Sequence, residues 1–225
     1  MKKSEWLQPW EPVDWRAKIK VGGLILFYFI LQAVLVQLLH SMFNEIWIVI
    51  LVTVISTPIF LWVTHRMGFE IGNWRRIDKQ MIKEALLWTV GLNVFLIVYE
   101  VVLNVLGLNV QTTENQEILQ SMAGQMPLIT QVAVFGILGP LVEEVLFRSF
   151  IMRYFFPRWS FVGIGFSVYL FATAHVHRNF VELSVYLIMG FALSFAYAKK
   201  RQLEFPILIH LFNNLYAVAM MLLWP

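Results

Sequence analysis

Long apolar runs alternate with short polar connections along the 225 residues of the chain. A helix that crosses a lipid bilayer needs about 20 mainly apolar residues. Seven segments fit this length, at about 21–40, 46–65, 85–107, 128–149, 160–177, 181–198 and 205–224. The pattern predicts an all-α integral membrane protein in which residues 21–225 form one polytopic bundle of seven transmembrane helices.

Two connections are long enough to hold an eighth helix. Residues 69–83 (FEIGNWRRIDKQMIK) fit an amphipathic helix in the membrane interface, with its basic face toward the headgroups. The same residues fit a solvated basic loop equally well. The second connection, residues 108–127, is polar and carries Gln and Glu.

The composition agrees with a membrane protein. Hydrophobic residues make up 59% of the chain and charged residues 14%, whereas soluble domains carry about 25% charged residues. There is no cysteine, which excludes disulfides, thiolate metal sites and a cysteine nucleophile. Residues 1–20 are polar and rich in Trp, without the cleavage pattern of a signal peptide, so we interpret them as a retained juxtamembrane segment.

Lys and Arg gather in the connections that fall on one side if the seven spans alternate. These connections hold Lys2, Lys3, Arg16, Lys18 and Lys20; Arg66, Arg75, Arg76, Lys79 and Lys83; Arg153 and Arg158; and Lys199, Lys200 and Arg201. On the opposite side, Arg178 is the only basic residue. Because short cytoplasmic loops carry an excess of Lys and Arg, the N-terminus is predicted to be cytoplasmic and the C-terminus to lie outside.

Three ionisable residues fall close together in the fourth apolar segment: Glu143, Glu144 and Arg148. A charge near the bilayer centre costs at least about 2.5–3.5 kcal/mol, so such residues mark functional sites by default. Glu144 and Arg148 are four positions apart and are predicted to form an ion pair on one helix face. Glu143 then faces a cavity, expected among the last four helices, as a candidate general base. The alternative is a buried ion-pair cluster of all three residues, or an anchor at the cytoplasmic end of the helix.

Histidines at the ends of two later segments supply further candidates. His175 follows small residues that let helices approach closely, and we expect it to reach the cavity. His177, two positions on, cannot share its helix face, and we interpret it as an interfacial residue.

His210 and Asn214 lie four positions apart on one face of the last helix. An imidazole N–H and a carboxamide N–H are two donors that can converge on one oxyanion. Asn213 is predicted to be rotated off that face. The alternative is that these residues only form hydrogen bonds between helices, as His and Asn often do in membranes.

The predicted depth of His175 conflicts with this site. Simple alternation places Glu143 and His210 in the inner half of the membrane and His175 near the outer end of the fifth span. At about 1.5 Å per residue, that separation is too large for a shared water. Either the fifth span begins later or tilts, or residues 175–181 fold back into the membrane around a cavity; otherwise His175 is not catalytic.

Other hydrolase patterns are missing: the sequence has no G-x-S-x-G, no Ser/Lys pair within a span, no pair of aspartates in separate spans and no H-E-x-x-H. Three short motifs are instead present in order: EEVLFR at 143–148, FATAH at 171–175 and HLFNN at 210–214. They resemble the Glu-Glu-x-x-x-Arg, Phe-x-x-x-His and His-x-x-x-Asn motifs of the CAAX protease and bacteriocin-processing (Abi) family. The resemblance covers about the last 100 residues.

This resemblance implies an intramembrane glutamate-type endopeptidase with a catalytic core at about 128–225. Glu143 and His175 would activate a water, His210 and Asn214 would form the oxyanion hole, and Glu144 and Arg148 would support the site. The implied setting is a prokaryotic plasma membrane. The expected partners are the lipid bilayer and a peptide or membrane-protein substrate without a prenyl group, and no nucleic acid.

No cofactor is expected, but the residue types leave zinc open. Two His and a Glu form a catalytic zinc set, which here would be Glu143, His175 and His210. A metal-free site is favoured because Asn is a poor zinc ligand and a good oxyanion donor.

Two other function classes fit the same spans. One is a non-enzymatic membrane protein that confers immunity to a peptide toxin or bacteriocin by binding it or its receptor. The other is a proton-coupled transporter with Glu143 as the relay, although the sequence shows no pair of halves with interrupted helices. Gly136, Gly139 and Pro140 are expected to loosen the fourth span just before the glutamates.

Overall fold

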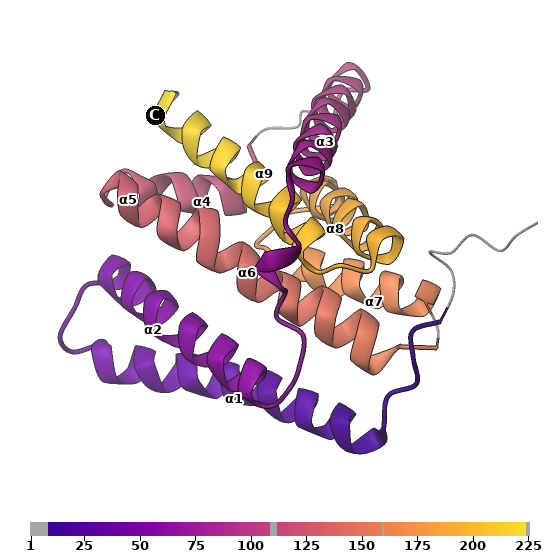
Figure 1. Ribbon diagram of the computed structural model, residues 1–225. Helices are drawn as coiled ribbons and strands as arrows, with labels where there is room; N and C mark the ends of the chain where they lie inside the picture. Colours follow the sequence, from indigo (N-terminus) through magenta and orange to yellow (C-terminus); the bar gives the residue numbers. More distant parts are fainter. Residues whose placement is uncertain (1–8, 109–111, 159, 224–225) are drawn as a thin grey trace, which may run out of the picture.

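The computed structural model describes residues 9–108, 112–158 and 160–223 (Figure 1). Within these ranges the chain is helical without strands, and six helices are long and apolar enough to cross a membrane. They are α1 (Trp15–Leu39), α2 (Glu45–Arg66), α3 (Lys79–Val105), a composite helix (Leu128–Phe155), α8 (Phe180–Lys200) and α9 (Glu204–Leu223). The prediction of an all-α integral membrane protein is confirmed.

The composite helix that carries the glutamates changes its winding three times, between α-helical and π-helical segments. It consists of α5 (Leu128–Gln131), the π-helical η3 (Val132–Leu138), α6 (Gly139–Glu144) and the π-helical η4 (Val145–Phe155). π-Helical turns are rare and occur frequently at functional sites. The expected loosening before Glu143 is therefore present, as the wider winding of η3.

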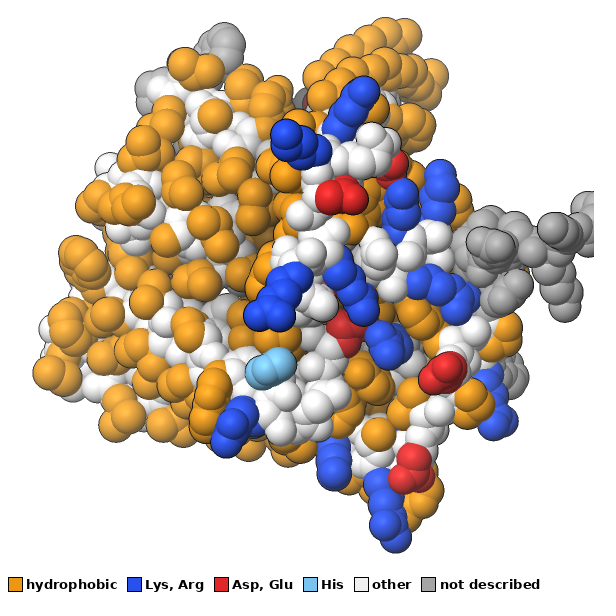
Figure 2. Space-filling model, in the orientation of Figure 1, with side chains coloured by type: hydrophobic (Ala, Val, Ile, Leu, Met, Phe, Trp, Pro, Cys, Tyr) orange, Lys and Arg blue, Asp and Glu red, His pale blue; other side chains and the backbone are white. Residues whose placement is uncertain are grey.

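The other helices pack around the composite helix. The α1–α2 hairpin lies along one side, and α7 (Ser160–Thr173), α8 and α9 lie along the other, with α3 packed against α9 (Figure 1). Large apolar side chains remain exposed along α1, α2 and α3, as expected for surfaces that face lipid. Lys and Arg side chains gather on one face of the molecule (Figure 2); the cytoplasmic orientation of that face stays a prediction.

The fifth predicted span is shorter than the pattern indicated. Helix α7 ends at Thr173 and has 14 residues, so it is about 21 Å long, short of a full crossing. Residues 174–179 follow as a non-helical connection before Asn179 caps α8 by accepting a hydrogen bond from the Glu182 N–H. His175 therefore lies in a connection at the end of a short helix.

The amphipathic helix predicted at 69–83 is not formed. The structure has a single 3₁₀ turn there, η2 (Trp74–Arg76), and α3 begins at Lys79. Gly68 and Gly72 adopt positive φ angles of 80° and 98°, which favour glycine and interrupt a helix. The Asp78 side chain then accepts a hydrogen bond from the Met81 N–H and caps α3.

This connection is held against the core by Glu70. Its carboxylate accepts hydrogen bonds from Arg153 at 2.7 Å and from the Tyr197 hydroxyl at 2.9 Å. The Ser149 hydroxyl donates to its carbonyl at 2.9 Å. The loop interpretation is therefore correct in outline, but the loop is anchored.

The polar connection at 108–127 does contain an additional helix. Helix α4 (Glu114–Ala123) has 10 residues, too few to span a bilayer. At the N-terminus, α1 begins at Trp15 and so includes part of the segment interpreted as juxtamembrane; residues 1–8 of that segment lie outside the described residues.

Candidate active site

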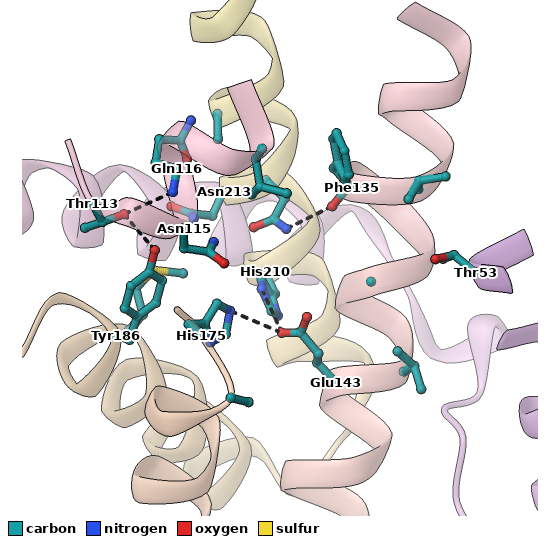
Figure 3. A pocket seen from close by; sticks show the side chains of 18 of the residues that line it. Thr53, Thr113, Asn115, Gln116, Phe135, Glu143, His175, Tyr186, His210 and Asn213 are labelled. Atoms are coloured by element: carbon teal, nitrogen blue, oxygen red, sulfur yellow. Dashed lines mark hydrogen bonds and ion pairs between the residues drawn. The ribbon is translucent and has the colours of Figure 1, made fainter. Parts of the chain in front are cut away.

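A cavity of about 1140 Å³ opens among α1, α2, α3, α4, the composite helix, α8 and α9, so it is not confined to the last four predicted spans, because the first three helices also pack around it. Glu143, His175 and His210 point toward one another in its wall (Figure 3). The structure thus brings together residues that lie up to 67 positions apart in the sequence, from Glu143 to His210. Asn214 lines the same cavity.

One carboxylate oxygen of Glu143 faces both imidazoles. Its Oε2 lies 3.9 Å from His175 Nε2 and 3.8 Å from His210 Nε2. These distances exceed a direct hydrogen bond and suit a bridging water. The side chain of Glu143 is 28% exposed, whereas that of Glu144 is fully buried. Of the two glutamates, Glu143 is therefore the one whose side chain is accessible from the cavity, and its Oε2 atom is buried there without a hydrogen-bond partner among the described residues.

Glu144 and Arg148 form the ion pair that their spacing predicts. Arg148 Nη1 lies 3.0 Å from Glu144 Oε1, and both side chains are fully buried. Arg148 Nη2 also donates to the carbonyl of Gly190 at 3.2 Å, and the guanidinium lies 4.6 Å from the ring centroid of Phe171. The pair joins the composite helix to α7 and α8. The alternative of a closed cluster of all three charges does not fit the cavity-facing Glu143.

Hydrogen bonds set the orientation of both imidazoles. His210 Nδ1 lies 2.9 Å from Glu144 Oε1, and His175 Nδ1 lies 2.7 Å from the carbonyl of Phe171. A carboxylate and a carbonyl only accept, so each Nδ1 carries a proton. In both residues Nε2 therefore faces Glu143, as a lone pair in the neutral ring and as an N–H donor in the protonated ring.

The short helix α7 resolves the conflict over the depth of His175. Because α7 ends at Thr173, the connection that follows bends into the cavity. His177 does not line the cavity; its Nδ1 bonds to the carbonyl of His175 at 2.7 Å. These positions agree with the expectation from the sequence that His175 reaches the cavity and His177 does not.

Asn214 is tied to the opposite wall. Its amide donates to the carbonyl of Phe135 in η3 at 2.9 Å. A carboxamide has two N–H donors, so one remains for a ligand. Asn213 also lines the cavity, contrary to its predicted rotation away, and its Oδ1 accepts from Asn93 of α3 at 3.0 Å. Asn213 and Asn214 both line the cavity because the cavity extends around α9.

Tyr186 of α8 is a site residue that the sequence did not indicate. Its ring stacks on His175, with centroids 4.4 Å apart and planes 14° apart. Its hydroxyl bonds to Thr113, the residue that caps α4, at 2.8 Å (Figure 3). A tyrosine in an apolar segment carries no signal that separates this role from ordinary packing.

The residue types of Glu143, His175 and His210 also allow a metal centre. Within the described ranges, no group of three His, Cys, Asp or Glu side chains is arranged to hold a metal ion. The preference for a metal-free site stays a prediction, and the proposed chemistry uses only this chain's own residues and water.

The helices and the cavity define an integral membrane protein with a Glu/His site inside its bundle. The family model of type II CAAX prenyl endopeptidase Rce1-like proteins matches residues 125–216, so this part of the chain is similar to that family. The match covers all of the proposed site residues.

Curated relatives point to the same family. YdiL of Bacillus subtilis, named as a candidate membrane peptidase, is 32% identical over 49% of this chain and 44% of its own length. The membrane-embedded CAAX protease MroQ of Staphylococcus aureus is 30% identical over 65% of this chain and 61% of its own. The UPF0177 protein YxdF of Lactococcus lactis is 26% identical over 67% and 85%. The chain thus spans less than half of YdiL, and no solved structure matches it.

Proposed function

We propose that this protein is an intramembrane endopeptidase that hydrolyses a peptide bond with a water activated by Glu143 and His175. The observation that carries the proposal is the convergence of two imidazole Nε2 atoms on Glu143 Oε2, at 3.8 and 3.9 Å, inside a cavity of a membrane bundle. The substrate is a peptide or a segment of a membrane protein. The family match and the protease name of one relative support the same activity.

Glu143 acts as the general base. Its Oε2 accepts a proton from the water, which His175 Nε2 holds in place, while the water oxygen forms a bond to the substrate carbonyl carbon. The carbonyl becomes a tetrahedral oxyanion. When the C–N bond breaks, Glu143 returns the proton to the leaving amine, so the carboxylate is regenerated.

His210 and Asn214 stabilise the oxyanion. The free N–H of Asn214 donates directly. His210 donates only when Nε2 carries a proton, because Nδ1–H is committed to Glu144. Glu144, held by Arg148, stabilises this protonated ring, in the way that a carboxylate orients the imidazole of a catalytic triad.

The test compares cleavage of a reporter peptide by wild type, Glu143→Gln and Asn214→Ala in detergent or vesicles. Glu143→Gln is expected to abolish cleavage while the amount of folded protein is unchanged. A Glu143→Gln variant that retains the cellular function, with no cleavage by wild type, would instead indicate an immunity or toxin-binding protein.

A further inference from the structure

A second intramembrane carboxylate, Glu100 of α3, lines the same cavity as the candidate catalytic residues. Its side chain is half-buried, and within the described residues it has no hydrogen-bond or ion-pair partner. A carboxylate in an apolar helix is costly unless it is paired or serves a function. A purely structural carboxylate would be paired or would lie away from the cavity. Glu100 is unpaired within the described residues and lines the cavity.

Apart from His175 and His210, the ionisable carboxylate, Lys and Arg side chains that line the cavity in the described residues are all acidic. Glu100, Glu117 and Glu143 line it, and no Lys or Arg does so in the part of the chain that the structure describes. The charge of Glu117 is committed, because its carboxylate bonds to Arg178 and raises the pKa of that guanidinium. Glu143 is assigned to the water. Glu100 is therefore the carboxylate of the cavity that can form an ion pair with a positive charge on the ligand.

The distance between Glu100 and the cleaved bond can be derived from the position of Glu100 along α3. Asn93 of α3 bonds to Asn213 of α9 at 3.0 Å, next to Asn214. Glu100 is seven residues further along, on the same face of the helix, which places it about 10 Å from that level. An extended peptide covers this distance in about three residues.

We propose that Glu100 selects substrates with a Lys, an Arg or a free amino group about three residues from the cleaved bond. This inference rests on the proposed endopeptidase function and names the charge of its substrate. The ammonium or guanidinium group of the substrate forms the ion pair that Glu100 lacks within the described residues.

Three peptides test the proposal, each with Lys, Gln or Glu at the third position on both sides of one cleaved bond. Wild type is expected to cleave the Lys peptide with a kcat/KM about tenfold higher than the Gln peptide, as for a hydrogen bond to a charged group. Glu100→Gln should remove this preference, and Glu100→Lys should transfer it to the Glu peptide. Glu45→Gln, an exposed carboxylate at the start of α2 outside the cavity, should leave it unchanged.

The outcome for charge selection is separate from the outcome for catalysis. If wild type cleaves all three peptides equally, or if the preference survives in Glu100→Gln, the assignment of Glu100 is overturned while the endopeptidase stands. If no peptide is cleaved, the Kd of the same labelled peptides for the Glu143→Gln protein is measured by fluorescence anisotropy. Tighter binding of the Lys peptide that is lost in Glu143→Gln/Glu100→Gln supports the selection, and equal binding overturns it.

Discussion

The ring of Tyr186 lies parallel to the ring of His175, 4.4 Å away, and connects this histidine to the polar helix α4 through the Thr113 hydroxyl. His175 itself lies in a non-helical connection, where its backbone N–H donates to the carbonyl of Ala172 at 3.2 Å but the direction of the side chain is not set by a helix. Stacking on Tyr186 and the hydrogen bond from Nδ1 to the Phe171 carbonyl therefore both orient the His175 ring so that Nε2 faces Glu143.

Substitution of Tyr186 should separate stacking from hydrogen bonding. Tyr186→Leu is expected to lower kcat by about 10²-fold, because a misplacement of about 1 Å in a catalytic group has effects of this size. Tyr186→Phe keeps the ring and loses only the bond to Thr113, so kcat should fall less than tenfold. Steady-state kinetics on one reporter peptide gives both values. Equal effects of the two substitutions would show that Tyr186 does not position His175 by stacking.

The two adjacent glutamates should respond differently to the same substitution. Glu144→Gln leaves the fully buried Arg148 without its countercharge, a change that typically costs about 3–5 kcal/mol of folding free energy. Glu143→Gln should change stability by less than about 0.5 kcal/mol, although activity is lost. Thermal unfolding of the purified variants in one detergent measures the difference. Comparable losses of stability in both would place Glu143 in the structural ion-pair network.

Close packing of α7 against α8 depends on Gly190. A Cβ there would lie 3.1 Å from Phe171 Cδ1 and 3.3 Å from the carbonyl oxygen of Val168. Gly190→Ala is therefore expected to destabilise the protein by about 1–3 kcal/mol, and to displace the Gly190 carbonyl that Arg148 contacts.

The matched control for this prediction is Gly165→Ala in α7. A Cβ at Gly165 would meet no atom within 4 Å, and Ala favours a helix by up to about 1 kcal/mol over Gly. Gly165→Ala should thus be neutral or stabilising in the same unfolding measurement. A similar loss for both variants would show that the effect at Gly190 is not steric.

Most of the helical architecture was predictable because each span is a continuous apolar run. The exceptions have local causes. Helix α7 stops at Thr173 although apolar residues continue, since hydropathy does not indicate where a short helix gives way to a connection. The segment at 69–83 has the charge pattern of an amphipathic helix, but the positive φ angles of Gly68, just before it, and of Gly72 within it, together with the Asp78 cap, prevent one continuous helix.

The site was predictable where it depends on spacing within one helix. The Glu144–Arg148 pair follows from a separation of four residues. The Glu144–His210 bond and the stacking of Tyr186 on His175 join residues far apart in sequence, so they depend on tertiary packing. Asn213 was misplaced because the width of the cavity around α9 cannot be derived from one helix.

Asn214 and Asn213 provide a test of the oxyanion hole with a neighbouring control. Asn214→Ala removes a donor aimed into the cavity and should lower kcat by about 10²–10³-fold with little change in KM. Asn213→Ala removes the bond to Asn93, which should reduce stability by about 0.6 kcal/mol and leave kcat within a few-fold of wild type. The reverse order of effects on kcat would assign oxyanion stabilisation to Asn213.

Removal of metal ions should leave activity intact. The proposed reaction uses a carboxylate, two imidazoles and a carboxamide, and no step in it requires a metal ion. Wild type dialysed against a chelator should retain its kcat/KM, and added zinc should not raise it. A loss that zinc restores would instead make Glu143, His175 and His210 metal ligands. Glu143→Gln would then lower metal content as well as activity, which elemental analysis of the purified variant would measure directly.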